Sequence, residues 1–395
     1  MQTGTILWQP DPKALEKGNF HAFLKEAEKA AGKPIGDFTA LHAWSVSDLE
    51  GFWSLVWDFC GVIGEKGAAA TSPEMPMPGA RFFPEARLNF AENLLRRRGG
   101  DDAIVFRGED KLSVRLSWDE LHAEVSRMQQ FLKDAGVGKG DRVAAMLPNM
   151  PQAVIGMLAT SSLGAIWSSC SPDFGEGGVL DRFGQIEPAV FISCDGYWYN
   201  GKRIEIAEKL QAIAAKLTSV KRIVIADYLG SAKDVAAGLP NAVSWAEGPG
   251  SHTAGEVTFE RLSFQHPLYI LFSSGTTGIP KCIVHSQGGT LLQHLKEQQL
   301  HCNLKPGDRF FYFTTCGWMM WNWLVTGLAS GATLMLFDGS PFAPEARVLF
   351  DYAEQERFTF FGTSAKYIDA VRNSGLRPVE SHDLSSLAMM TSTGS

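Results

Sequence analysis

The sequence predicts an α/β fold in which largely parallel sheets are flanked by helices. From residue 103 onward, short apolar runs alternate with amphipathic segments of helical period. Parallel strands need a long crossover connection, usually a helix, so this alternation implies parallel sheets that helices cover on their faces. No internal repeat is visible. With 395 residues, the chain can hold two or more structural units around a substantial core.

Residues 1–100 are expected to form an N-terminal segment of helices and extended chain. The expected elements are a helix around Phe20 to Leu24, a helix over Val46 to Phe59 capped by the Ser45 cluster, a linker over 62–80, and an extended stretch over 82–98 that leads into a short helix. Its tryptophans are expected to pack in the core. The run Arg96–Arg98 suits the C-terminal end of a helix dipole, and a phosphate site is the alternative.

A first α/β unit is expected over about residues 101–228. It should begin with a β-hairpin over 103–118. The following elements are a helix from Asp119 to Ala135, a strand at 140–148, a helix from Pro151 to Leu163, a strand at 165–171, a helix from Gly175 to Ile186, a strand at 188–195, a helix from Arg203 to Leu217, and a strand at 220–227.

A polar bridge over about 229–264 separates this unit from a second α/β unit over about 265–395. The second unit begins with a strand at 268–272. Its later elements are a helix from Gly288 to about Leu300, a strand at 308–314, a turn and helix from residue 317, a strand at 331–339, a helix from Pro344 to Glu354, a strand at 358–364, a helix from Ala365 to Asn373, and a strand at 385–395.

Bulk properties exclude several classes of protein. A net charge of -7 argues against binding nucleic acid through bulk electrostatics, although a local positive site can still bind a small anion. The six cysteines are scattered without a C-x-x-C pair, which favours reduced thiols over disulfides or a zinc site. No signal peptide and no membrane-spanning run is apparent, so we expect a cytoplasmic protein.

The strand at 268–272 leads into the most informative stretch of the chain, SSGTTGIPK at 273–281. Its glycines allow close approach of backbone N–H groups to an anion, its four hydroxyls add donors, and Lys281 adds positive charge. The spacing differs from the common P-loop, in which G-x-x-x-x-G-K-S/T opens a helix. The alternative is a surface loop between two strands, but the combination of features favours a polyphosphate-binding loop.

This stretch resembles the signature loop of adenylate-forming acyl-CoA synthetases, with Cys282 in place of the usual glycine. The resemblance implies two largely parallel sheets in an AMP-binding large domain over 101–395, preceded by an N-terminal cap segment. It also implies ATP, Mg²⁺ and CoA as cofactor and substrates. The residues implied for ATP phosphate binding are Ser273, Ser274, Gly275, Thr276, Thr277, Gly278 and Lys281, of which Thr276, Thr277 and Lys281 are implied to be catalytic.

Further strand ends carry the residues that the resemblance assigns to other subsites. Trp318, Met319 and Met320 follow a glycine and could begin a core helix, but the family's turn here lines the acyl pocket, together with the position of Thr393. Gly394 and Ser395 match the adenine-binding loop. For CoA, the candidates are Lys202, Arg203 and Thr363, although for the first two the pattern favours the alternative of surface charges at a helix start. The metal ligands are not identified.

Several phrases, among them LWQPDP, CGWMMWN and LMLFDGSPF, look like the acetoacetyl-CoA branch of this family more than the acetyl-CoA branch. This implies activation of acetoacetate through an acyl-adenylate, giving acetoacetyl-CoA, AMP and pyrophosphate. The alternatives are a ligase for acetate, propionate or butyrate, and a non-catalytic nucleotide-binding fragment. The family's later motifs do not occur, so the chain resembles an incomplete N-terminal portion, and we expect it not to complete adenylation alone.

Overall fold

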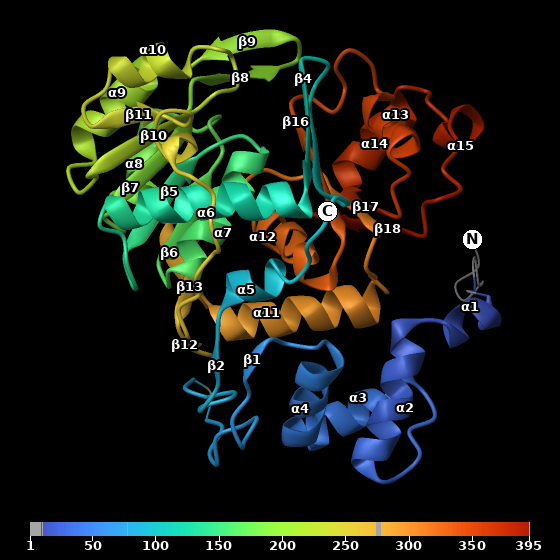
Figure 1. The fold of residues 1–395 in the computed structure, drawn as a ribbon. Coiled ribbons are helices and arrows are strands. Elements are labelled where there is room, and N and C mark those ends of the chain that lie inside the picture. Colours follow the sequence, from blue (N-terminus) through green and yellow to red (C-terminus); the bar gives the residue numbers. More distant parts are fainter. Residues whose placement is uncertain (1–8, 10, 77, 274–277, 395) are drawn as a thin grey trace.

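The computed structural model describes residue 9 and residues 11–76, 78–273 and 278–394. Four N-terminal helices lie at one end of the molecule and two large sheets with their helices lie at the other (Figure 1). The N-terminal helices are α1 (Pro12–Glu16), α2 (Asn19–Ala31), α3 (Phe38–Ser47) and α4 (Leu49–Phe59). The long helix α11 (Gln287–Lys296) runs between them and the sheets (Figure 1).

The first large sheet has seven strands in the order β11-β10-β7-β5-β6-β13-β14. Its strands are β5 (Arg142–Met146), β6 (Ile166–Cys170), β7 (Val190–Cys194), β10 (Arg222–Ala226), β11 (Ala242–Ser244), β13 (Pro267–Ser273) and β14 (Lys281–Ser286). Every neighbouring pair is parallel except β13 and β14, which are antiparallel.

The second large sheet has six strands in the order β18-β17-β15-β16-β3-β4. Its strands are β3 (Asp102–Gly108), β4 (Leu112–Ser117), β15 (Arg309–Tyr312), β16 (Thr333–Asp338), β17 (Phe360–Ser364) and β18 (Met389–Thr393). Only β3 and β4 are antiparallel, as the expected hairpin requires. The predicted class, with two largely parallel sheets flanked by helices, is confirmed.

The remaining elements connect or cover these sheets. The helices are α5 (Phe90–Leu94), α6 (Trp118–Asp134), α7 (Pro151–Ser162), α8 (Glu176–Phe183), α9 (Ala207–Lys216), α10 (Ala232–Ala237), α12 (Met319–Thr326), α13 (Val348–Gln355), α14 (Ala365–Asn373) and α15 (Pro378–Ser381), with the 3₁₀ turns η1 (Pro249–Ser251) and η3 (Gly327–Ser330) and the π-helical turn η2 (Glu297–His301). The small strands are β1 (Gly64–Glu65), β2 (Arg87–Leu88), β8 (Gly196–Tyr199), β9 (Lys202–Glu205) and β12 (Leu262–Ser263).

The sheets do not follow the expected division of the chain at the 229–264 bridge. The hairpin β3–β4 joins the later strands, because β3 pairs with β16 over Ile104 to Gly108. Conversely, β13 and β14 join the earlier strands, because Tyr269 on β13 pairs with Trp167 on β6. The order of the strands along the chain does not determine which strands pair, because strands that are consecutive in the sequence are not always neighbours in a sheet.

Local chemistry explains the central helices. Helix α6 begins with a capping box in which Ser117 and Glu120 satisfy each other's backbone N–H groups. Helix α7 has proline at its start and is buried almost all round, as its nearly continuous apolar and small residues allow. Trp167 on β6 stacks on Trp321 of α12, which connects the first sheet with the helix that follows β15.

Two expectations about the N-terminal segment are corrected. The single helix expected over Val46 to Phe59 is two helices, because Asp48 ends α3 and accepts a hydrogen bond from the Gly51 N–H at the start of α4. Helix α5 ends at Leu94, so the three arginines do not lie at a solvated helix end. Trp44 and Trp57 are buried as expected.

The helix expected from Arg203 to Leu217 begins only at Ala207. Residues 196–205 instead form the antiparallel hairpin β8–β9, which Asn200 and Gly201 connect with φ angles of 53° and 71°. An Asn-Gly pair between short strands is a strong hairpin signal, so the sequence did carry this information. Lys202 and Arg203 therefore lie on a strand and not at a helix start.

Candidate functional site

The two large sheets meet at the carboxyl ends of their strands. Asn149, just after β5, donates to the Thr314 and Phe337 carbonyls at 3.5 and 3.4 Å and accepts from the Trp321 indole N–H at 3.0 Å. Ser169 on β6 donates to the Cys316 carbonyl at 2.7 Å. Ligands of open α/β sheets bind at such strand ends, so this junction is the candidate functional site.

The junction also contains a carboxyl group with an unusual environment. Tyr228, after β10, donates its hydroxyl to Asp338 at the end of β16, with an O···O distance of 3.0 Å. Burial raises the pKa of Asp338 to about 7, and the nearby Asp173 and Glu109 add to the rise while the Tyr228 hydrogen bond opposes it. Asp338 is therefore largely protonated at pH values where an exposed carboxyl is charged.

The predicted phosphate-binding loop lies at this same edge of the first sheet. Ser273 ends β13, Lys281 begins β14, and the two residues are paired across the antiparallel ladder. Gly278 has a φ of 116°, a conformation that favours glycine, and a Cβ there would contact none of the described residues within 4 Å. Ser274, Gly275, Thr276 and Thr277 lie outside the described residues.

Sequence reasoning missed two residues that support this loop. Gln185, just after α8, donates to the Pro280 carbonyl at 2.9 Å. The guanidinium of Arg182 on α8 lies over the rings of Phe174 and Phe272, 4.3 and 5.9 Å from their centroids, close to the end of β13. Neither residue belongs to a local motif, because each reaches the loop only through the packing of α8.

The predicted acyl-pocket turn lies one strand away. A Cβ on Gly317 would contact the Cys170 Cα at 3.6 Å and the Ser171 nitrogen at 3.8 Å, so this turn packs on the end of β6, the neighbour of β13. Met319, Met320 and Thr393 line one cavity of about 410 Å³. Trp318 is 67% exposed and does not line it.

Several residues with polar groups line the rest of the cavity, although most of its accessible surface is apolar. They are Lys296, Glu297, His301, Tyr312, Thr391 and Ser392, and Cys302 and Trp323 complete the lining. Glu297 accepts hydrogen bonds from the Gln293 amide at 2.7 Å and from the Trp323 indole at 3.1 Å, which holds η2 against α12. The hydroxyl of Thr391 is buried and has no partner among the described residues. Burial lowers the pKa of His301, and Lys296 lowers it further.

The remaining predicted site residues are separated. Gly394 directly follows β18 with a φ of 76°, and Ser395 lies outside the described residues. Arg203, on the hairpin β8–β9, donates hydrogen bonds to Glu205 and to the carbonyl of Leu229, which follows β10. Thr363 is buried on β17, and its hydroxyl has no partner in the described part of the chain. The three CoA candidates therefore come from two different parts of the fold.

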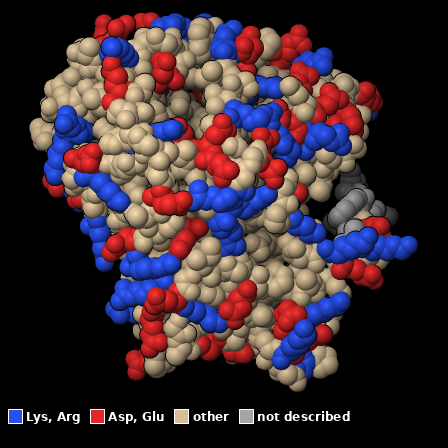
Figure 2. All heavy atoms as spheres, in the orientation of Figure 1, with Lys and Arg blue, Asp and Glu red and all other residues tan. Residues whose placement is uncertain are grey.

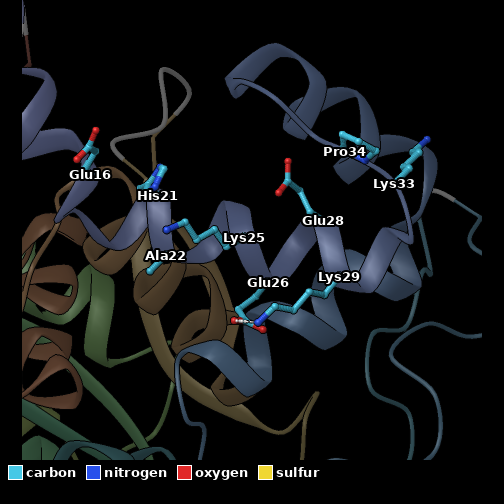
Figure 3. Close-up of a pocket in the computed structure, with 9 residues that line it drawn as sticks. All are labelled: Glu16, His21, Ala22, Lys25, Glu26, Glu28, Lys29, Lys33 and Pro34. Atoms are coloured by element: carbon cyan, nitrogen blue, oxygen red, sulfur yellow. Dashed lines mark hydrogen bonds and ion pairs between the residues drawn. The ribbon is translucent and has the colours of Figure 1, made fainter.

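A hollow of about 670 Å³ on the outer face of α2 is not a convincing alternative site. Its charged side chains are spread along the helix and do not converge on one point, and Lys29 pairs with Glu26 (Figure 3). The three glutamates of its wall balance the three lysines. Elsewhere, acidic and basic side chains are interspersed over the face shown in Figure 2.

The described residues contain neither a clustered set of metal ligands nor a helix that could span a membrane. No cluster of three or more His, Cys, Asp or Glu side chains with the geometry of a metal site occurs among them. None of the helices in these ranges is both long and apolar enough to cross a membrane.

Comparison with known proteins agrees with this geometry. The family model described as AMP-binding enzyme matches residues 90–395. The acetoacetyl-coenzyme A synthetase of Rhizobium meliloti (strain 1021) is 60% identical over the whole chain, which spans 60% of that protein. The malonamoyl-CoA synthetase of Penicillium aethiopicum is 38% identical over 92% of the chain and 53% of its own length.

A solved structure, that of acetoacetyl-CoA synthetase from Streptomyces lividans, superimposes with a TM-score of 0.94 at 40% identity. The match covers 99% of this chain and 60% of that one. The chain thus spans about 60% of the length of the relatives that it matches. Since the family model covers most of the sequence, the chain belongs to the family of AMP-binding enzymes.

Proposed function

We propose that the chain provides the ATP-phosphate and acyl-binding parts of an acetoacetate–CoA ligase. In this reaction the acetoacetate carboxylate attacks the α-phosphorus of ATP, and pyrophosphate leaves. The thiol of CoA then attacks the acyl-adenylate and displaces AMP, giving acetoacetyl-CoA. We assign residues 101–395 to the AMP-binding domain and residues 1–100 to a cap segment.

The observation that carries the proposal is the proximity of the two subsites. The loop that Ser273 and Lys281 close and the turn at Gly317 lie at the ends of adjacent strands, β13 and β6. A bound carboxylate near the turn can thus be brought next to a nucleotide on the loop. Holding two anions together in this way requires positive charge and oriented N–H donors, which the loop sequence and Lys281 offer.

In this proposal, each part of the chain has a separate task. Ser273, Ser274, Gly275, Thr276, Thr277, Gly278 and Lys281 bind the phosphates and stabilise the charge that develops on pyrophosphate. Met319, Met320 and Thr393 contact the acyl group, and Trp318 covers its carboxylate. Gly394 and Ser395 contact adenine, and Lys202, Arg203 and Thr363 are the candidates for CoA. Mg²⁺ would arrive with ATP and neutralise phosphate charge.

The polar residues of the acyl cavity support a β-carbonyl acid as the substrate. A saturated acid such as butyrate can use only the apolar part of the wall and leaves the donors of Lys296 and Ser392 without a hydrogen bond to the ligand. The ketone of acetoacetate accepts a hydrogen bond, which lining side chains such as Lys296 or Ser392 can donate. Two relatives are named for acetoacetyl and malonamoyl groups, and both groups carry a second carbonyl at the same position.

Titration calorimetry of the chain with MgATP tests the phosphate loop. Lys281→Ala should weaken binding by about tenfold or more, the usual effect of losing a charge-assisted hydrogen bond. The matched control is Lys216→Ala, which removes another exposed lysine and should bind ATP like the unmodified chain. Equal ATP affinity of the unmodified chain, Lys281→Ala and Lys216→Ala would show that the loop does not bind ATP, as expected of a non-catalytic fragment.

Ligand-observed NMR in the presence of ATP tests the acyl class. Saturation transfer to acetoacetate should be stronger than transfer to acetate, propionate or butyrate at equal concentration. Equal transfer to butyrate and acetoacetate would contradict the proposed preference and favour a ligase for another short-chain acid.

A further inference from the structure

A second cavity, outside the site described above, has a strongly basic wall. It lies between the start of α2, the end of α4, the segment after α5, and the turn η3, and its volume is about 410 Å³. None of its described lining residues also lines the acyl cavity. Its charged lining residues are Arg96, Arg97 and Lys305, and no acidic residue is among the described residues that line it. This local excess of positive charge occurs in a chain whose net charge is -7.

Arg96 is the most unusual of the three. Its guanidinium donates to the Gly61 carbonyl at 2.5 Å and to the Asn93 amide oxygen at 3.2 Å, and burial lowers its pKa. Within the described residues it pairs with no carboxylate, and its buried Nε has no acceptor. The Cys60 thiol beside it cannot supply negative charge, because burial raises the pKa of that thiol to about 12. A half-buried cation without a counter-ion is costly, and an anion would relieve that cost.

Arg97 and Lys305 complete a positive arc. Arg97 donates to the Gly331 carbonyl at 2.7 Å, and its contact with Asp101 is a 3.3 Å pair to a carboxylate that is 83% exposed, which offsets little of its charge. The Lys305 ammonium donates to the Lys17 carbonyl at 3.1 Å and makes no ion pair with a described carboxylate. It therefore retains donors for a ligand.

The remaining lining residues indicate which other groups the ligand has besides its anionic group. Phe59 and Pro306 present apolar surface, while Asn19, Gln299 and Ser330 add polar groups. Guanidinium groups recognise phosphate through forked pairs of hydrogen bonds, and lysine adds a point charge. The volume is within the range of small-molecule sites.

We propose that this cavity binds a phosphate-bearing small molecule, with its phosphate between Arg96, Arg97 and Lys305 and its carbon skeleton against Phe59 and Pro306. The site is separate from the proposed catalytic loop, so it would bind its ligand whether or not the chain activates a carboxylate. Because α2 and η2 pack together beside both cavities, a ligand here would stabilise the junction between the N-terminal helices and the sheets.

Titration calorimetry and ³¹P line broadening with inorganic phosphate and phenyl phosphate test the proposal. Both probes are measured in the unmodified chain and in Lys281→Ala, which disables the other expected phosphate site. Binding should persist in Lys281→Ala, and phenyl phosphate should bind more tightly than phosphate if the apolar wall contributes. Lys305→Glu should weaken both probes by about tenfold or more.

Two further variants make the test specific. Lys33→Glu makes the same change of net charge on an exposed residue elsewhere and should leave affinity nearly unchanged, because salt screens distant charges. Arg96→Lys keeps the charge but removes the fork, so it should weaken phosphate binding while thermal unfolding confirms a folded chain. The proposal is overturned if phosphate binding vanishes in Lys281→Ala, or if Lys305→Glu and Arg96→Lys bind both probes like the unmodified chain.

Discussion

Ser273 and Lys281 lie opposite each other in the antiparallel pair of β13 and β14. Directly opposed residues of such strands have Cα atoms about 5 Å apart, so the ladder holds both ends of the intervening loop at one place. A loop with fixed ends loses less conformational entropy when it closes on a ligand than a loop whose ends are free to move. The register of β13 and β14 thereby preorganises the proposed phosphate-binding segment for its ligand.

Gly278 provides a direct test of this loop. Gly278→Ala forces an L-residue to a φ of 116°, at a strain of about 1–3 kcal/mol, and the added Cβ would meet none of the described residues within 4 Å. We expect weaker ATP binding, measured by calorimetry. Gly99→Ala is the matched control, since Gly99 has a φ of 112° and equally open surroundings. A similar loss of ATP affinity in both variants would rule out a specific role for Gly278.

Met320 should limit the length of acid that the acyl cavity accepts. Met320→Ala removes a half-buried side chain from the wall, which makes room for about two more methylene groups. Binding of hexanoate relative to acetoacetate should rise by about tenfold or more, measured by saturation-transfer NMR. Met390→Ala, on the same strand as Thr393 but outside the cavity wall, should leave that ratio unchanged. An unchanged ratio of hexanoate to acetoacetate binding in Met320→Ala would show that the acyl group binds elsewhere.

Asp338 should make the fold less stable as pH rises. Its folded pKa is raised from 3.8 to about 7, so the favourable state is the protonated one, fully present below pH 3.8 and lost as pH rises through about 7. Because the residue keeps some solvent access, we expect an effect of about 2 kcal/mol. Asp338→Asn should gain stability relative to the unmodified chain between pH 5 and pH 8, measured by thermal unfolding. A pH-independent difference would contradict this assignment.

His294 should make the fold less stable as pH falls, which is opposite to the pH dependence expected from Asp338. It is buried on α11, lies 2.9 Å from the Thr326 hydroxyl through Nδ1, and has its pKa lowered from 6.5 to about 3 by burial and by His285. Its neutral form is favoured in the fold, so stability falls as pH drops from 6.5 toward 3. By pH 5 this amounts to about 2 kcal/mol.

The variant His294→Asn keeps a donor near Thr326 but does not titrate. It should be less stable than the unmodified chain at pH 8, because packing is lost, and the difference should shrink by pH 5. Chemical denaturation at both pH values measures it. A penalty that grows toward low pH would show that His294 is protonated in the folded state.

Much of the fold could be predicted from local patterns. The helix over Ala365 to Asn373 was predicted with both ends correct, and the hairpin of β3 and β4 and the helix α6 were predicted within a residue or two. Each has a local cause: a cap at Ser364, a capping box at Ser117, and alternating apolar residues. The hairpin at Asn200 was missed although its turn signal was present.

The candidate site was predictable only in part. Lys281, Met320 and Thr393 were predicted from motif resemblance, and their roles stay predictions; in the structure Lys281 begins β14, and Met320 and Thr393 line one cavity. Gln185 and Arg182 could not be found in this way, because their contacts with the loop depend on how α8 packs on the sheet. The basic cavity at Arg96 combines residues from four separate elements, so no local pattern marks it.

The sequence by itself determined the type of most main elements, the α/β class and the composition of the loop at 273–281. Hydrophobic period, caps and turn residues act over a few positions, and they can be read without knowing the fold. Only the tertiary structure decided which sheet each strand joins, that β3 pairs with β16, and that the acyl turn lies beside the strand before the loop. These are long-range contacts, whose energies depend on burial between segments far apart in the chain and not on any local pattern.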